Sequence, residues 1–190
     1  MLIIKYLKEY VLDNFDYLAF IGTYTKGNVV NEGLKSKGIY ILGYNSKSGE
    51  LGLLNTAYEK DNPSFLSVSP DGKYLYYSED MYPGGYFQYN KDPNDQIYVI
   101  KRYEFETGKT ETITGGPGGA ARPTISRDGK KLAFVKRVRT KSVLYIHDLE
   151  TGQEWPIYDK LNKDQQEAWA LFGVYPNFSW MPNNNEIVFW

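Results

Sequence analysis

The sequence contains no cysteine and a single histidine in 190 residues. This composition excludes a cysteine-based zinc site, a thiol nucleophile, a disulfide framework and a cluster of histidine ligands for a metal. We therefore expect no bound metal and no other cofactor.

The chain also lacks an excess of either charge. It has 22 lysines and arginines against 23 aspartates and glutamates, which gives a formal net charge of -1. Such a balance supplies no broad field to steer a nucleic acid or an anionic membrane toward the protein. We expect neither of these as a partner.

A long apolar run is missing from the first 20 residues. Leu2–Ile4 is apolar, but Lys5, Lys8 and Glu9 interrupt the run. The segment therefore has neither the core of a signal peptide nor the length of a membrane span. The expected location is the cytoplasm by default, or the periplasm or the exterior if a leader is missing from the sequence.

The same segment has apolar residues at helical spacing, among them Ile4, Leu7 and Val11. This spacing predicts a short amphipathic helix within residues 1–16. We expect the helix to cover an exposed sheet edge.

Repeated turns set the expected architecture. Ser69–Gly72 reads Ser-Pro-Asp-Gly, and the pattern returns as Ser126–Gly129 and, in degraded form, as Met181–Asn184. Each copy lies between two apolar segments, and in the first two copies glycine supplies the positive φ that a tight turn needs. The repeats therefore predict β-hairpins.

A second family of turns alternates with the first, at Lys47–Glu50, Glu106–Lys109 and Glu150–Gln153. Gly108 and Gly152 are about 44 residues apart, the length of one four-stranded propeller blade. The crossover helices that a parallel sheet would need are absent from the pattern. We predict an all-β chain that forms part of a β-propeller.

The repeats place blades at about 18–56, 64–114, 122–158 and 175–190. The first blade would lack its innermost strand and the last would keep only two strands, giving about three and a half blades, too few to close a ring. Residues 17–190 are therefore expected to form an incomplete propeller, in keeping with a truncated piece of a larger one. Its expected partners are the remaining blades, or a second chain through self-association of the open sheet edges.

All the tight turns would lie on one side of the propeller and all the long connections on the other. Loops on one face of a rigid repeat scaffold are where such proteins bind ligands and partners. The long connections are expected at residues 25–37, 81–95, 115–121, 138–141 and 159–174.

The connection near residue 90 contains Tyr86, Gln88, Tyr89 and Asn90. Aromatic rings stack on a sugar-like ring, and amides form hydrogen bonds with its edges. These four residues are therefore candidates for binding a small sugar-like ligand. A lid packed on a neighbouring domain is the favoured alternative.

Two charged residues complete the candidate site. Arg122 enters an innermost strand near the propeller axis and would present a guanidinium to an anionic ligand or a partner carboxylate. Glu167 lies in a long connection and would act as an acid, a base or an ion-pair partner. Because neighbouring strand residues point to opposite sides, His147 and Asp148 are not expected to form a catalytic pair.

Several motifs carry a family resemblance over residues 63–190. They are Tyr86–Pro93, Gly118–Pro123, Asp164–Trp169, Gly173–Pro176 and Ile187–Trp190. In these motifs the chain resembles the TolB-like, WD40-type propeller that precedes the catalytic domain of certain amidohydrolase-superfamily proteins. The resemblance implies an accessory or substrate-gating module of a hydrolase whose catalytic domain lies elsewhere.

Residues 20–79 resemble a different propeller family, the lactonases typified by 6-phosphogluconolactonase. The matching motifs are Gly22–Thr25, Ser36–Tyr40, Gly49–Leu51 and Asn62–Leu66. This resemblance implies a sugar-lactone hydrolase as the alternative function. A TolB-like protein-binding module is a third interpretation.

Overall fold

The computed structural model describes residues 14–23, 25, 36–59, 62–81, 98–116, 118–138, 141–161 and 177–190. In these residues thirteen strands form four separate antiparallel sheets. The all-β prediction with four-stranded antiparallel sheets is confirmed. The predicted helix lies mostly outside the described residues, and the division of the chain into an edge cover and a propeller stays a prediction.

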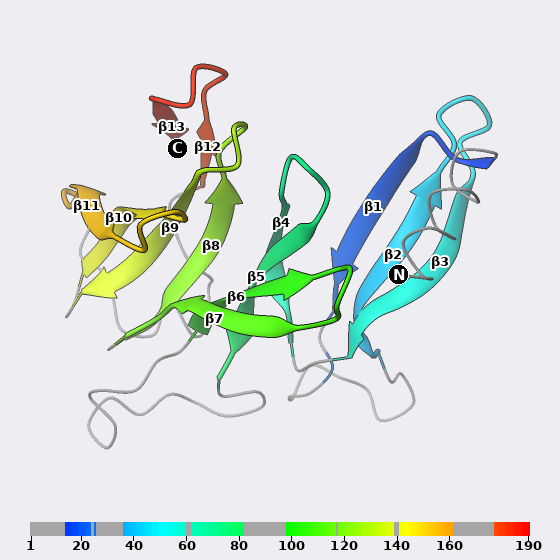
Figure 1. Cartoon of the computed structure of the whole chain (residues 1–190), viewed down its shortest axis with the longest axis horizontal. Coiled ribbons are helices and arrows are strands. Elements are labelled where there is room, and N and C mark those ends of the chain that lie inside the picture. Colours follow the sequence, from blue (N-terminus) through cyan, green and yellow to red (C-terminus); the bar gives the residue numbers. More distant parts are fainter. Residues whose placement is uncertain are drawn as a thin grey trace.

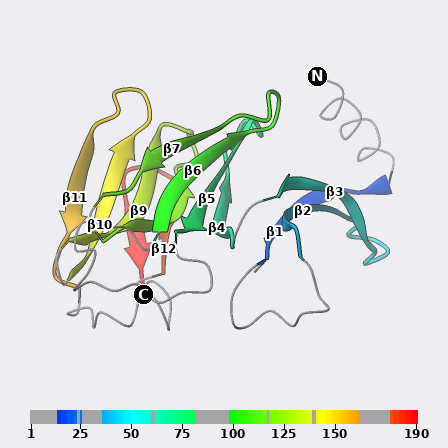
Figure 2. The same ribbon diagram turned by 90° about the horizontal axis from the view of Figure 1, so that it is seen from below.

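The sheets follow one another along the chain (Figures 1 and 2). The first holds β1 (Tyr17–Gly22), β2 (Gly38–Tyr44) and β3 (Leu51–Glu59). The second holds β4 (Ser64–Val68), β5 (Tyr74–Asp80), β6 (Tyr98–Glu104) and β7 (Thr110–Thr114). The third holds β8 (Ala120–Ile125), β9 (Lys131–Val138), β10 (Lys141–Asp148) and β11 (Glu154–Tyr158). The fourth holds β12 (Phe178–Trp180) and β13 (Ile187–Phe189).

The Asp-Gly repeats form hairpins, as predicted. Between β8 and β9, Ser126 N–H donates to Lys131 O at 2.8 Å, and Gly129 adopts a φ of 74°. The Ser126 hydroxyl donates to Asp128 Oδ1 at 2.6 Å, and this hydrogen bond lowers the pKa of the Asp128 carboxyl. In the third copy Asn184 takes the left-handed position of the glycine, with a φ of 58°.

The two turn families lie on the same side of each complete sheet. Phe105 N–H, just before the Glu106–Lys109 turn, donates to Lys73 O, just after the Ser69–Gly72 turn, at 3.0 Å. Leu149 N–H donates to Lys130 O at 2.9 Å in the same way one sheet later. Figure 1 shows the hairpins β4–β5, β8–β9 and β12–β13 on one side of the molecule. Strands β4 and β8 therefore begin on the opposite side.

The core lies between the sheets, and β9 shows why. Leu132 and Phe134 point to the second sheet, where they pack with Tyr76 and Ile100. Ala133 and Val135 point the other way and pack with residues of the fourth sheet. All four β9 residues are fully buried, because side chains alternate along a strand and both faces of the third sheet are covered. A similar cluster around Ile39, Leu75 and Tyr77 joins the first two sheets.

The outer part of the first sheet holds an aromatic ring on two glycines. Gly43 and Gly52 are paired across β2 and β3, and the Phe15 ring lies against both. A Cβ on Gly43 would meet this ring at 2.4 Å. Glycine is required here because the ring occupies the space of a side chain.

We expect Gly43→Ala to lower the free energy of unfolding by about 1–3 kcal/mol, since overpacking displaces the Phe15 ring. Urea unfolding followed by tryptophan fluorescence measures the change. In a Phe15→Ala background the same glycine substitution is expected to cost much less, because no ring remains to be displaced. Equal costs in the two backgrounds would contradict the clash as the cause.

Candidate functional site

The innermost strands of the second and third sheets carry matching irregularities near their starts. The register shifts between Ser64 and Ser67 in β4, and between Ala121 and Thr124 in β8. Within these bulges Phe65 has a φ of 51° and Arg122 a φ of 61°. Positive φ is uncommon for residues other than glycine and costs free energy, so it persists only where the surrounding structure enforces it. Each bulge changes the direction in which its side chain, Phe65 or Arg122, points.

The Phe65, Arg122 and Asn177 side chains contact one another in a row across the second, third and fourth sheets, and we call this row the ladder. Phe65, Arg122 and Asn177 each occupy the fourth position before a hairpin repeat, which begins at Ser69, Ser126 or Met181. The Arg122 Cζ lies 4.2 Å from the centroid of the Phe65 ring. Its Nη1 donates to Asn177 Oδ1 at 2.5 Å. Equivalent residues of consecutive sheets thus contact one another directly.

The backbone of Arg122 is also fixed. Its N–H donates to the Ser78 hydroxyl at 3.1 Å, which links β8 to β5 of the preceding sheet. Stacking on a ring and hydrogen bonding to an amide hold the guanidinium in one orientation. Because β4 contacts β8 and β8 contacts β12, this ladder lies along the inner strands, on the side opposite the tight turns.

Arg122 therefore lies in an inner strand, where the sequence predicted it. The other predicted site residues, Tyr86, Gln88, Tyr89, Asn90 and Glu167, lie outside the described residues. The binding role of all six stays a prediction.

A polar group at the entrance to β4 was not predicted from the sequence. Asn62 is 4% exposed and has a φ of 45°. Its Oδ1 accepts from Thr25 N–H at 2.8 Å, and its Nδ2 donates to Asp80 Oδ2 at 3.2 Å. The available signal was the Asn-Pro dipeptide before the strand, because asparagine tolerates the left-handed conformation and bonds nearby backbone groups. This group joins the end of the first sheet to the start of the second.

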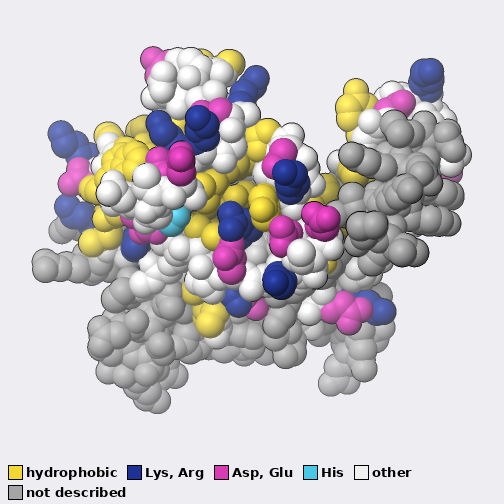
Figure 3. All heavy atoms as spheres, in the orientation of Figure 1, with side chains coloured by type: hydrophobic (Ala, Val, Ile, Leu, Met, Phe, Trp, Pro, Cys, Tyr) yellow, Lys and Arg dark blue, Asp and Glu magenta, His cyan; other side chains and the backbone are white. Residues whose placement is uncertain are grey.

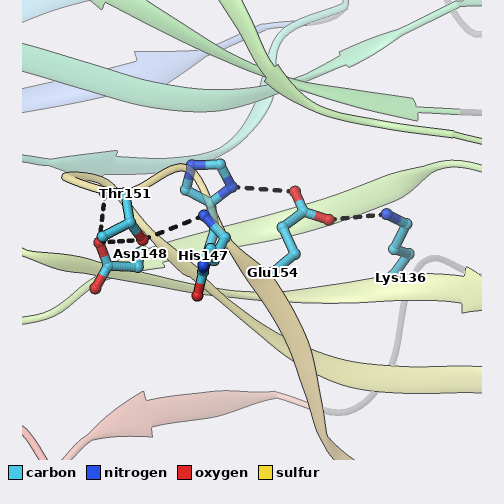
Figure 4. Close-up of polar contacts among 6 residues, drawn as sticks. Lys136, His147, Asp148, Thr151 and Glu154 are labelled. Atoms are coloured by element: carbon cyan, nitrogen blue, oxygen red, sulfur yellow. Dashed lines mark hydrogen bonds and ion pairs between the residues drawn. The ribbon is translucent and has the colours of Figure 1, made fainter.

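The single histidine belongs to a charged cluster on the outer strands of the third sheet (Figure 4). His147 Nδ1 lies 3.1 Å from Glu154 Oε1, across β10 and β11. Lys136 Nζ, on β9, donates to Glu154 Oε2 at 2.9 Å. Partial burial alone would raise the pKa of Glu154. Hydrogen bonds from His147, Thr114 and Lys136 outweigh this effect and lower the pKa to about 2.

Asp148 does not take part in this cluster. Its Oδ1 accepts from Thr151 N–H at 2.8 Å and from the Thr151 hydroxyl at 3.0 Å, within the tight turn. His147 and Asp148 therefore contact different partners, and their lack of a catalytic role stays a prediction. Because Thr114 ends β7 in the second sheet, the cluster around Glu154 fastens the second sheet to the third.

The described ranges contain no group of three or more acidic, histidine or cysteine side chains placed to hold a metal ion. Among the same residues no helix is long and apolar enough to cross a membrane. Figure 3 shows lysines and arginines interspersed with acidic side chains on the visible described surface.

The depressed pKa of Glu154 predicts a pH-dependent contribution to stability. The contribution is fully present above pH 4.5, the unfolded value, and disappears as the pH falls toward 2. We expect it to amount to on the order of 2 kcal/mol. Glu154→Gln should lower the unfolding free energy at pH 7, with little difference from the unsubstituted chain near pH 2. Urea unfolding at several pH values measures this, and a pH-independent difference would contradict it.

Comparison with known proteins identifies relatives of this chain. The family model described as "Lactonase, 7-bladed beta-propeller" matches residues 18–120. A 6-phosphogluconolactonase of Formosa agariphila is 40% identical over 57 residues, which is 30% of this chain and 14% of that protein. The chain thus matches only a small part of this relative's length.

Two solved structures share the fold. TolB from Acinetobacter baumannii superposes with a TM-score of 0.54 and 16% identity, covering 90% of this chain and 35% of TolB. An oligogalacturonate lyase in complex with manganese gives a TM-score of 0.52 and 15% identity, covering 90% of this chain and 41% of the lyase. At these identities the similarity shows the propeller fold alone.

The comparisons support the lactonase resemblance and a TolB-like fold, whereas the link to an amidohydrolase stays a prediction. The lactonase match extends beyond residues 20–79, where the sequence motifs indicated it, and includes the whole second sheet. The chain belongs to the lactonase family of seven-bladed β-propellers.

Proposed function

We propose that this chain forms part of a sugar-lactone hydrolase, in which Arg122 binds an anionic group of the substrate. The observation that carries the proposal is the Phe65–Arg122–Asn177 ladder within a lactonase-family propeller. The substrate class follows from the Formosa agariphila relative, a 6-phosphogluconolactonase.

The ladder suits the recognition of an anion. A guanidinium pairs with phosphate or carboxylate through two parallel hydrogen bonds, and it does so best when its plane is already fixed. The Phe65 ring and the Asn177 amide fix that plane before a ligand arrives. Less side-chain freedom is then lost on binding, which favours affinity.

Hydrolysis of a lactone needs more than a residue that binds the substrate. Water adds to the ring carbonyl, the ring C–O bond breaks, and the products are a carboxylic acid and a hydroxyl group. A hydrogen-bond donor near the carbonyl would stabilise the oxyanion that forms on the way. We assign to Arg122 the binding of substrate.

The accessory role that the amidohydrolase resemblance implies remains the second proposal. The two proposals predict different activities, because an accessory propeller would shape access to a separate hydrolase and would not itself hydrolyse a lactone. An assay of the purified chain distinguishes the two.

We expect the purified chain to hydrolyse 6-phosphogluconolactone above the spontaneous rate, measured as proton release at constant pH. Arg122→Gln should lower kcat/KM by about 10- to 100-fold, because a hydrogen bond between charged groups is lost. Arg127→Gln is the matched control. It removes the same charge from an exposed position on the tight-turn side and should leave kcat/KM unchanged.

Circular dichroism confirms that each variant is folded before it is assayed. No turnover by the unsubstituted chain would refute lactone hydrolysis by this chain and favour the accessory role. Turnover that survives Arg122→Gln unchanged would refute only the assignment of Arg122.

A further inference from the structure

Three of the four polar groups of Asn177 are bound by other residues. Asn177 lies directly before β12, and its backbone pairs with that of Trp190 in the β12–β13 hairpin. Its N–H donates to Trp190 O at 3.2 Å, and its C=O accepts from Trp190 N–H at 3.0 Å. Its side-chain Oδ1 accepts from Arg122 Nη1 at 2.5 Å. Within the part of the chain that the structure describes, Nδ2 is the one polar group of Asn177 that has no hydrogen-bond partner.

Arg122 determines which end of the Asn177 amide is left open. A guanidinium has only N–H donors, so the amide atom that it contacts must be the oxygen. The oxygen and the nitrogen diverge from the same carbon, and the Nδ2 group is therefore directed away from this hydrogen bond. Asn177 is half-buried. It presents two N–H donors at the inner strand of the fourth sheet, on the side opposite the tight turns.

Arg122 and Asn177 thus place two donor groups of different character side by side. The charged guanidinium suits a group that is anionic throughout the reaction, such as phosphate. The neutral amide binds an uncharged carbonyl oxygen weakly and a negatively charged oxygen more strongly, because a hydrogen bond to an ionised group is about twice as strong. The pair therefore suits the phosphate and the carbonyl of a phosphorylated lactone.

We propose that the Asn177 amide binds the oxyanion that forms on the lactone carbonyl, which makes Asn177 a catalytic residue. This inference rests on the proposed function. The oxygen of water bonds to the carbonyl carbon and releases a proton to solvent, and the carbonyl oxygen becomes negatively charged. The C=O bond then re-forms as the ring C–O bond breaks, and the ring oxygen takes up a proton from solvent. Asn177 Nδ2 donates to the carbonyl oxygen while that oxygen is charged, and so binds the transition state more tightly than the substrate.

The donor is held in place before a substrate binds. Trp190 fixes the Asn177 backbone, and Arg122 fixes its amide. Arg122 is itself held by the Phe65 ring and by Ser78. A donor that needs no reorganisation during the reaction stabilises an oxyanion most effectively. Arg122 therefore has a second role, because it orients the Asn177 amide in addition to binding the phosphate.

Two substitutions separate the Nδ2 donor from the Oδ1 acceptor. Asn177→Asp removes the donor and keeps an acceptor for Arg122, whereas Asn177→Ala removes both. The kcat and KM for 6-phosphogluconolactone are measured separately, from proton release at constant pH. We expect kcat to fall about 100- to 1,000-fold in both variants, because an oxyanion donor acts on the chemical step. KM is also expected to rise in Asn177→Asp, whose carboxylate repels the phosphate.

Asn185→Asp is the matched control. It makes the same chemical change at an exposed position of the same hairpin, on the tight-turn side, and should leave kcat unchanged. Circular dichroism verifies that each variant is folded. An unchanged kcat in Asn177→Asp would overturn the inference, and so would a loss of kcat confined to Asn177→Ala, since Asn177 would then act only by holding Arg122. If the unsubstituted chain shows no turnover, lactone hydrolysis itself is refuted and the inference falls with it.

Discussion

The structure depends on the burial of a sheet between two neighbours. In β9 the residues Leu132 to Val135 alternate between two clusters, and each is fully buried. Burial of an apolar side chain contributes roughly 1.5–3 kcal/mol, so the stability of such a sheet comes mostly from the sheets beside it. A repeat structure of this kind is stable in proportion to the number of its inter-sheet contacts. Among the described residues, the third sheet packs on its neighbours through two such clusters and the first sheet through one.

The same constraint explains how the candidate site is built. Inner strands approach one another most closely, so equivalent residues of consecutive sheets come into contact there. Phe65, Arg122 and Asn177 use this proximity to form a ladder of a ring, a cation and an amide. The positive φ of Phe65 and Arg122 directs those side chains at their neighbours, and it costs free energy.

The sequence predicted the hairpins because Asp-Gly and Thr-Gly turns have a local physical cause. Glycine at the left-handed position and an aspartate that accepts turn hydrogen bonds act within a few residues. The bulges could not be predicted, since neither Phe65 nor Arg122 is a residue that favours positive φ. The contact between His147 and Glu154 was also missed. Alternation gives the side of a strand to which a side chain points, whereas the partner depends on the register between strands.

Equivalent positions of the second and third sheets show where repeats diverge. Tyr103 and His147 each lie five residues before the turn glycine, and Thr110 and Glu154 each follow it by two. In the second sheet Tyr103 packs edge-on against Phe105, whereas in the third His147 contacts Glu154. The turn hydrogen bonds are the same in both, so the backbone is constant while the side chains between sheets change. Repeats with the same backbone can therefore differ in the side chains that they hold, and a side chain such as that of Arg122 can differ in one repeat without disturbing the others.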